Sequence, residues 1–229
     1  MMRILASMLL LLFGLLSPPG KSVRPGTVPR KQSPVPSATP FLGRDDRTQG
    51  NWTGVYGAEA FLAPVWNGLS IMKVPGLDLH RGIRMTTARP DPVPGPTDEI
   101  SEAQQGWAPF VHSRTSVDPR VPYHVPGLKE RMPVYFRTVG VPLYVEVEAE
   151  DGKAHQLSLY LLDFHRTGSV FKIELLDAHR HVLDTRRLDR FGGGSYLRYR
   201  VKGTRIVRIT PLTGHEATLS GAFLDPITQ

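Results

Sequence analysis

Apolar and polar residues alternate along the segment from Leu143 to Glu150. Leu143, Val145, Val147 and Ala149 alternate with Tyr144, Glu146, Glu148 and Glu150. A period of two is typical of a β-strand with one buried face, and it assigns the glutamates to the solvated face. Asp151-Gly152 follows, and because both residues tolerate positive φ we expect a hairpin turn that leads into the next strand.

Short apolar runs with turn residues between them continue to the C-terminus. We expect further strands at His155–Leu162, Phe171–Leu175, Val182–Leu188, Tyr196–Val201, Ile206–Thr210 and Ala217–Leu224. No amphipathic helix of three turns is evident after Phe41. The pattern therefore predicts an all-β domain over 41–229, an antiparallel β-sandwich or jelly roll. Proline and glycine gather around 72–105, so we expect an irregular surface insertion there.

The N-terminus has the pattern of an export signal. Met1-Met2-Arg3 precedes the uncharged apolar run Ile4–Leu16. At helical rise this run spans roughly 20 Å, which is short of the roughly 30 Å of a bilayer core. Residues 1–17 are therefore predicted to be a signal peptide or N-terminal anchor, and the protein to be secreted, periplasmic or at the cell surface. Any membrane contact is expected through this segment alone.

Residues 18–40 are predicted to be a disordered, basic, proline-rich linker, because they contain few large apolar residues. Its positive charges fit either contact with an anionic surface or a solvated spacer. The whole chain carries a formal charge of +7 and no cysteine, which excludes disulfides, thiolate metal sites and a cysteine nucleophile. Nucleic acid is not expected as the partner of an exported chain.

Three groups of residues resemble a module of exported bacterial proteins that is often attached to glycoside hydrolases. They are Phe41–Asp45 with Thr48–Gly57; Asp118-Pro119-Arg120; and Gly152–Tyr160 with Leu162-Asp163-Phe164, Leu183-Asp184-Thr185, Gly193–Leu197 and Leu219–Asp225. The resemblance spans about 41–225. It implies a galactose-binding-like or carbohydrate-module-like β-sandwich outside the cell, without catalysis of its own.

Aromatic residues are the first candidates for ligand contact, because their flat faces can stack on sugar rings. The candidates are Trp52, Tyr56, Trp66 and Trp107. Trp52 and Tyr56 also fit a role in the core. Asp163 and His165 form a candidate acid–imidazole pair in the ligand site, although no serine in a nucleophile elbow completes a triad. No catalytic residue is predicted.

Charged residues suggest two more sites. Arg198, Arg200 and Lys202 are expected on one strand face, where they would form a basic stripe for an anionic polymer or a solvated outer face. Asp45, Asp46 and Asp225 lie near the two ends of the domain and could hold a structural Ca²⁺. No other cofactor is expected. His179-x-His181 has a metal-site spacing but also fits a surface turn.

Three functions remain open. The first is a non-catalytic exported module that binds carbohydrate or a cell-surface polymer. The second is a structural or spacer module of the envelope without a small ligand. The third is a divergent glycan-active enzyme, which would need two carboxylates facing each other across a sugar.

Overall fold

The computed structural model describes residues 39–62, 64–66, 71–73, 83–88, 109–111, 115–124 and 130–227. The signal-peptide or anchor segment and all but the last two residues of the linker lie outside these ranges, so the expectations for them stay predictions. Over the described ranges every regular element is a β-strand. None of the described residues belongs to a helix that is long and apolar enough to cross a membrane.

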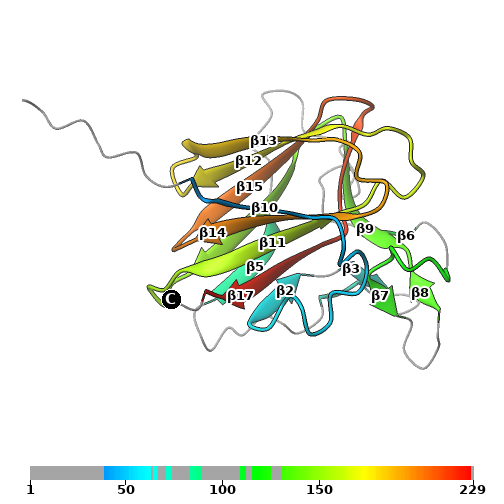
Figure 1. The fold of residues 1–229 in the computed structure, drawn as a ribbon. Helices are drawn as coiled ribbons and strands as arrows, with labels where there is room; N and C mark the ends of the chain where they lie inside the picture. The colour runs from blue at the N-terminus through cyan, green and yellow to red at the C-terminus, as the bar shows by residue number, and fades with distance from the viewer. Residues whose placement is uncertain are drawn as a thin grey trace, which may run out of the picture. The chain divides into compact units, whose positions relative to one another are not determined.

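Two five-stranded antiparallel sheets form the body of the domain (Figure 1). The first main sheet has the order β1 (Phe41–Asp45), β14 (Ser195–Val201), β11 (His155–Leu161), β17 (Gly221–Pro226) and β2 (Ala60–Leu62). The second main sheet has the order β13 (Val182–Leu188), β12 (Phe171–Asp177), β15 (Arg205–Pro211), β10 (Leu143–Ala149) and β5 (Ile83–Ala88).

Smaller sheets complete the described fold. A three-stranded sheet has the order β16 (Glu216–Leu219), β9 (Val134–Val139) and β6 (Pro109–Val111). Two-stranded ribbons join β3 (Pro64–Trp66) to β4 (Ile71–Lys73) and β7 (Tyr123–His124) to β8 (Arg131–Met132).

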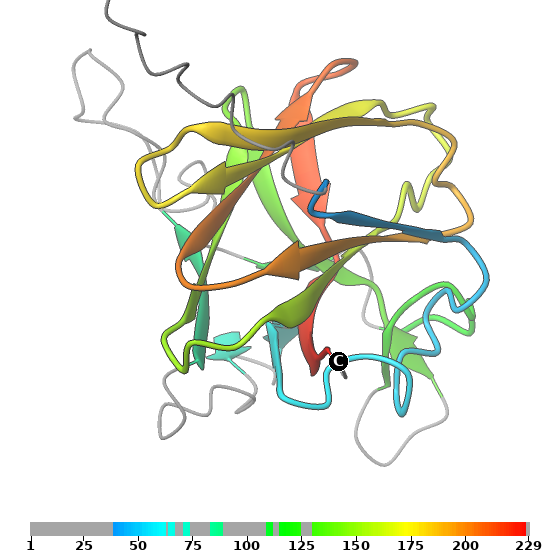
Figure 2. The ribbon, with the colours of Figure 1, turned by 60° about the vertical axis from the view of Figure 1, so that its left-hand side comes forward.

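The core lies between the two main sheets, as the alternating pattern predicts. Leu157, Leu159 and Leu161 of β11 and Val145 and Val147 of β10 are buried in one apolar cluster that draws on both sheets. Figure 2 shows the layered arrangement, with the blue β1 beside the orange β14. The predicted all-β, antiparallel sandwich is confirmed.

The expected hairpin at Asp151-Gly152 is wrong, although the turn itself forms. Gly152 has a φ of 75°, but β10 pairs with β5 and β15 whereas β11 pairs with β14 and β17. The turn therefore carries the chain from the second main sheet to the first. Local turn chemistry is the same in both cases, so it cannot reveal which strand becomes the neighbour.

Two other expectations need correction. The single strand expected over Ala217–Leu224 is two, because the chain changes sheets at Ser220: β16 pairs with β9, and β17 pairs with β11 and β2. Part of the segment expected to be irregular is also regular. Ile83–Ala88 forms β5, which pairs with β10 along six residues. Its alternation is weak, and pairing with β10 decides its conformation.

The outer face of the first main sheet carries a second apolar cluster. Tyr160, Tyr196 and Phe223 lie on neighbouring strands of this sheet and pack with Tyr56. Segments 46–59 and 115–122 lie against this cluster, since the hydroxyl of Tyr196 donates to the carbonyl oxygen of Gln49 and that of Tyr160 donates to the carbonyl oxygen of Arg120, both at 2.6 Å. The part of this face that carries the cluster, which would be solvated in a simple sandwich, is thus buried.

Candidate functional site

The loop 162–170 crosses from β11 to β12 and therefore from one main sheet to the other. The carboxylate of Asp163 organises this loop. Its Oδ1 accepts from the backbone N–H and the hydroxyl of Thr167 at 3.0 and 3.1 Å, and its Oδ2 accepts from the N–H groups of Gly168 and Ser169 at 2.9 and 3.2 Å. Both oxygens of Asp163 are thus engaged, which makes this residue the support of the loop.

Arg120 also contacts this loop. It pairs with Asp118, and its guanidinium donates to the carbonyl oxygens of Gly192 and Phe164. Its Cζ atom also lies 5.5 Å from the centre of the Phe164 ring, within reach of a cation–π contact. The hydrogen bond between the two side chains lowers the pKa of Asp118 and raises the pKa of Arg120. The pair stays charged at neutral pH.

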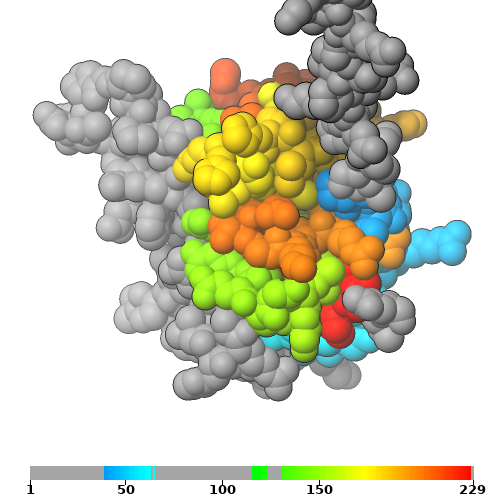
Figure 3. Space-filling model, turned by 90° about the vertical axis from the view of Figure 1, so that its left-hand side faces the viewer, coloured from blue at the N-terminus to red at the C-terminus, as the bar shows by residue number. Residues whose placement is uncertain are grey.

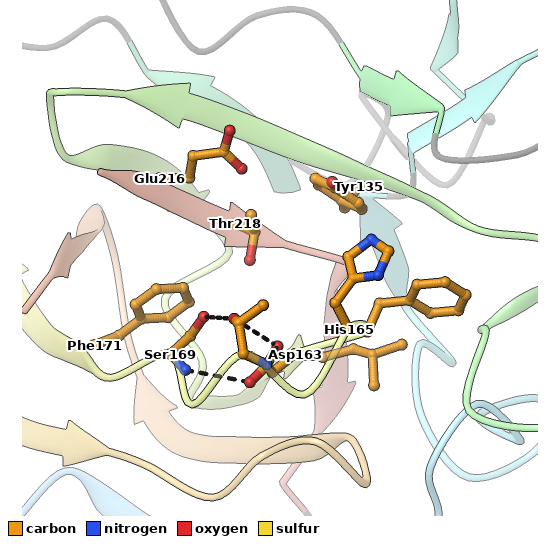
Figure 4. Close-up of a pocket in the computed structure, with 10 residues that line it drawn as sticks. Tyr135, Asp163, His165, Ser169, Phe171, Glu216 and Thr218 are labelled. Carbon is orange, nitrogen blue, oxygen red and sulfur yellow. Dashed lines mark hydrogen bonds between the residues drawn. The ribbon is translucent and has the colours of Figure 1, made fainter. Parts of the chain in front are cut away.

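A cavity of about 120 Å³ opens between this loop, β9 and β16 (Figure 4). Its walls are aromatic, acidic and hydroxyl-bearing; among them are Tyr135, Asp163, Phe164, His165, Glu216 and Thr218. Pockets that enclose a small molecule usually measure about 300–1,000 Å³. This cavity therefore suits one edge of a ligand whose remainder stays in solvent.

The side chains that line the cavity differ in their exposure and in the contacts that they already make. The His165 ring is exposed and lies edge-to-face against the Phe164 ring, with 5.3 Å between the centroids. Glu216 pairs with Arg137 across β16 and β9 at 3.1 Å, and 46% of its side chain remains exposed. Burial, with a smaller contribution from Glu216, raises the pKa of Tyr135, so its hydroxyl keeps its proton.

Asp163 and His165, predicted as ligand residues, thus line the same cavity, but with different roles. Sequence reasoning did not select Tyr135, Glu216 or Thr218. They lie on β9 and β16, and nothing in the local sequence shows that these strands pair next to the loop.

Trp52 and Tyr56 belong to the cluster on the outer face of the first main sheet. The indole N–H of Trp52 donates to the carbonyl oxygen of Pro122 at 2.8 Å, and its ring lies 4.9 Å from that of Phe223. Tyr56 is buried and stacks on Tyr196 at 4.3 Å. Tyr56 thus takes the core role that the sequence also fits, and its ligand contact stays a prediction. Trp52 is half-buried and serves the same packing.

The side chains of the other two tryptophans, Trp66 and Trp107, are not among those that the structure describes. Trp66 is the last residue of β3, and its side chain is not among those described. Trp107 lies outside the described residues. Their predicted ligand contacts stay predictions.

The basic stripe is interrupted. Arg198 and Arg200 alternate with the buried Leu197, Tyr199 and Val201 on β14, as predicted. Arg198 is half-buried beside Gly43 of β1, however, and its Nε has no hydrogen-bond partner among the described residues. Lys202 lies past the end of the strand. Only Arg200 is exposed on this face of β14 itself.

The three aspartates proposed for Ca²⁺ have other partners. Asp45 accepts from the hydroxyls of Thr48 and Tyr56 at 2.6 and 2.7 Å, and Asp46 accepts from Ser195 at 2.6 Å. Asp225 accepts from the N–H of Ala58 at 2.8 Å. Burial would raise the pKa of Asp45, but the hydrogen bonds from the hydroxyls of Thr48 and Tyr56, together with two from backbone N–H groups, lower it to about 2.

Over the described part of the chain, no group of three histidine, cysteine or acidic side chains could hold a metal ion. The Ca²⁺ site expected at Asp45, Asp46 and Asp225 stays a prediction. His179 and His181 lie in the turn between β12 and β13, where their N–H groups donate to Oδ1 of Asp177 at 2.8 and 2.9 Å. This is the surface turn that the sequence favoured.

No protein-family model matches the chain, and no curated protein sequence does. Among solved structures, it is similar to a Streptococcus pneumoniae fucose binding module at 20% identity, covering 41% of this chain and 70% of that one, with a TM-score of 0.31. The lectin domain of lectinolysin complexed with Lewis B antigen matches at 14% identity over 41% and 72%, with a TM-score of 0.30. A ruminal GH26 endo-β-1,4-mannanase matches at 13% identity over 42% and 20%, with a TM-score of 0.25.

Proposed function

We propose that this protein is a non-catalytic exported module that binds carbohydrate at the cavity beside the loop 162–170. The observation that carries the proposal is the convergence of aromatic rings and polar groups there: Tyr135, Phe164 and His165 lie beside Glu216 and Thr218. A sugar ring presents apolar C–H faces and hydroxyls on one small body, so it needs both kinds of contact. The apolar N-terminal run supports export.

The rigidity of the loop supports the proposal. The carboxylate of Asp163 accepts from N–H groups of its backbone, and the guanidinium of Arg120 donates to the carbonyl oxygen of Phe164. A preformed loop loses little conformational entropy when a ligand binds, so a shallow cavity can still give measurable affinity.

The test is binding of the full chain to immobilised neutral polysaccharides, with soluble sugars as competitors. His165→Ala should weaken retention by about 5- to 30-fold, as expected for the loss of one hydrogen bond or ring contact of about 1–2 kcal/mol. The matched control is His179→Ala, since His179 is also exposed but lies in the turn between β12 and β13. Equal retention of both variants would contradict the site.

A structural spacer without a small ligand is the second candidate. It is favoured by the use of Trp52 and Tyr56 in packing, which removes two aromatic residues that a ligand could have met. No retention of the unaltered chain on any neutral or acidic polysaccharide, at low or high salt, would support this alternative.

A further inference from the structure

A second and larger cavity, of about 470 Å³, lies at the opposite end of β11. Its lining includes Glu59, Lys153, His155 and Lys202 beside the apolar Pro226 and Ile227. His155 begins β11 and Leu161 ends it, so about 20 Å separates this cavity from the loop 162–170. Figure 3 faces this end of the domain, where the lime turn after β10 and the orange turn after β14 lie close to the red end of β17.

His155 forms the floor of the cavity and is only 1% exposed. Its Nδ1 lies 2.6 Å from Oε2 of Glu59, and its Nε2 lies 3.0 Å from Oδ1 of Asp151. A carboxylate can only accept a hydrogen bond, so both ring nitrogens must donate, and the ring is an imidazolium. The buried ring thereby ties the segment before β2 to the turn before β11.

Two lysines line the cavity, and Lys153 lies close enough to Asp151 to lower the pKa of that carboxyl. Lys153 and Lys202 are exposed and lie on different turns, and neither ammonium group forms an ion pair within the described ranges. Because the buried imidazolium lies between the carboxylates of Glu59 and Asp151, the exposed charges of the lining are the two lysines, and these favour an anion. Glu59 nevertheless offers a carboxylate oxygen that could accept from a hydroxyl.

We propose that this cavity binds an acidic sugar, with its carboxylate toward Lys153 and Lys202 and a ring hydroxyl toward Glu59. An inorganic anion would meet the Glu59 carboxylate with no hydroxyl to offer it, and a neutral sugar would leave both ammonium groups unused. The volume lies within the range of about 300–1,000 Å³ that encloses a small molecule. The apolar surfaces of Ala154, Pro226 and Ile227 can face the ring. This site does not depend on the function proposed for the other cavity.

The test is titration calorimetry of the full chain with galacturonate and glucuronate, against galactose, glucose and inorganic phosphate. We expect at least one uronate to bind, and NaCl to weaken it because the lysines are exposed. Lys153→Gln and Lys202→Gln should each weaken binding about fivefold, as the loss of one exposed ion pair predicts. Both lysines are on the surface, so the variants should fold.

Two variants serve as controls. Arg200→Gln removes an exposed positive charge from β14 outside the cavity and should leave uronate binding unchanged. His165→Ala alters the other cavity and should also leave it unchanged, which separates the two proposals. Equal binding of uronates and neutral sugars, tighter binding of phosphate, equal loss in Arg200→Gln, or no uronate binding would each overturn the inference.

Discussion

Gly194 lies directly against Tyr160: a Cβ atom at position 194 would stand 2.0 Å from the hydroxyl oxygen of that tyrosine. Gly194 also has a φ of 86°, in the left-handed region that favours glycine. The hydroxyl of Tyr160 cannot move away without losing its hydrogen bond to the carbonyl oxygen of Arg120. The turn before β14 and the segment 115–122 are therefore linked through one buried phenol.

Gly194→Ala should destabilise the protein by about 2–4 kcal/mol, because it adds a steric clash in a buried site to backbone strain. Gly193→Ala is the matched control, since a Cβ there meets nothing within 4 Å and the residue has no positive φ. Urea unfolding followed by circular dichroism measures both. Equal midpoints for the two variants would show that Tyr160 yields to the extra methyl group.

Segments that the resemblance singled out are explained by their packing. Gly50 and Asp118-Pro119-Arg120 are far apart in sequence, yet the Arg131 guanidinium donates to the carbonyl oxygens of Gly50, Pro119 and Val121 at 3.2, 3.0 and 2.7 Å. A Cβ at Gly50 would lie 2.5 Å from two of these oxygens. The motif residues thus assemble the layer over the first main sheet.

Arg131→Met should destabilise the protein by about 2–4 kcal/mol, because three carbonyl oxygens lose a charged donor. Arg200→Met is the control, since Arg200 is exposed. Thermal unfolding measures the difference, and limited proteolysis should show earlier cleavage within 46–59 in Arg131→Met. Cleavage at the same rate in both variants would contradict the role of Arg131 as the link between the two segments.

The sequence predicted strands well and their neighbours poorly. The alternation from Leu143 to Ala149 located β10, because the period of two follows from one buried face whichever strands lie beside it. The partners of β10 depend instead on contacts distant in sequence. Ile83–Ala88 pairs with it from about sixty residues away, and no local signal specifies this.

The candidate site was predictable in part for the same reason. Asp163 and His165 stood out because an acid and an imidazole lie two residues apart in the sequence. A core role for Tyr56 was among the expectations, but its partners were not, because the cluster on the outer face exists only once segment 46–59 folds over Tyr160 and Tyr196. An alternating strand alone would leave that face in water.

Asp163→Ala should loosen the loop 162–170, because three backbone N–H groups lose their acceptor. Hydrogen exchange should become faster at Thr167, Gly168 and Ser169, and stability should fall by about 1–3 kcal/mol. Asp189→Ala is a control, because Asp189 lies in another turn and has ion pairs of 3.5 and 3.7 Å with exposed arginines. Unchanged exchange at all three amides in Asp163→Ala would show that the loop holds without the carboxylate.

His155 should make the stability depend on pH near neutrality. Burial by itself would lower the pKa of His155, but its hydrogen bonds to Asp151 and Glu59 outweigh burial and raise the pKa above the ordinary 6.5. A raised pKa means that the folded state binds the proton more tightly than the unfolded state does. The stabilisation is therefore complete below pH 6.5 and is lost as the pH rises through the folded-state pKa.

The free energy of unfolding of the unaltered protein should accordingly decrease from pH 6 toward alkaline pH, as measured by urea titration at each pH. His155→Gln should be less stable at pH 6 and should show a flatter dependence, because the titrating group is gone. His179→Gln, which changes an exposed histidine, should keep the original slope. If His155→Gln and the unaltered protein lose stability in parallel, the imidazolium does not link Glu59 to Asp151.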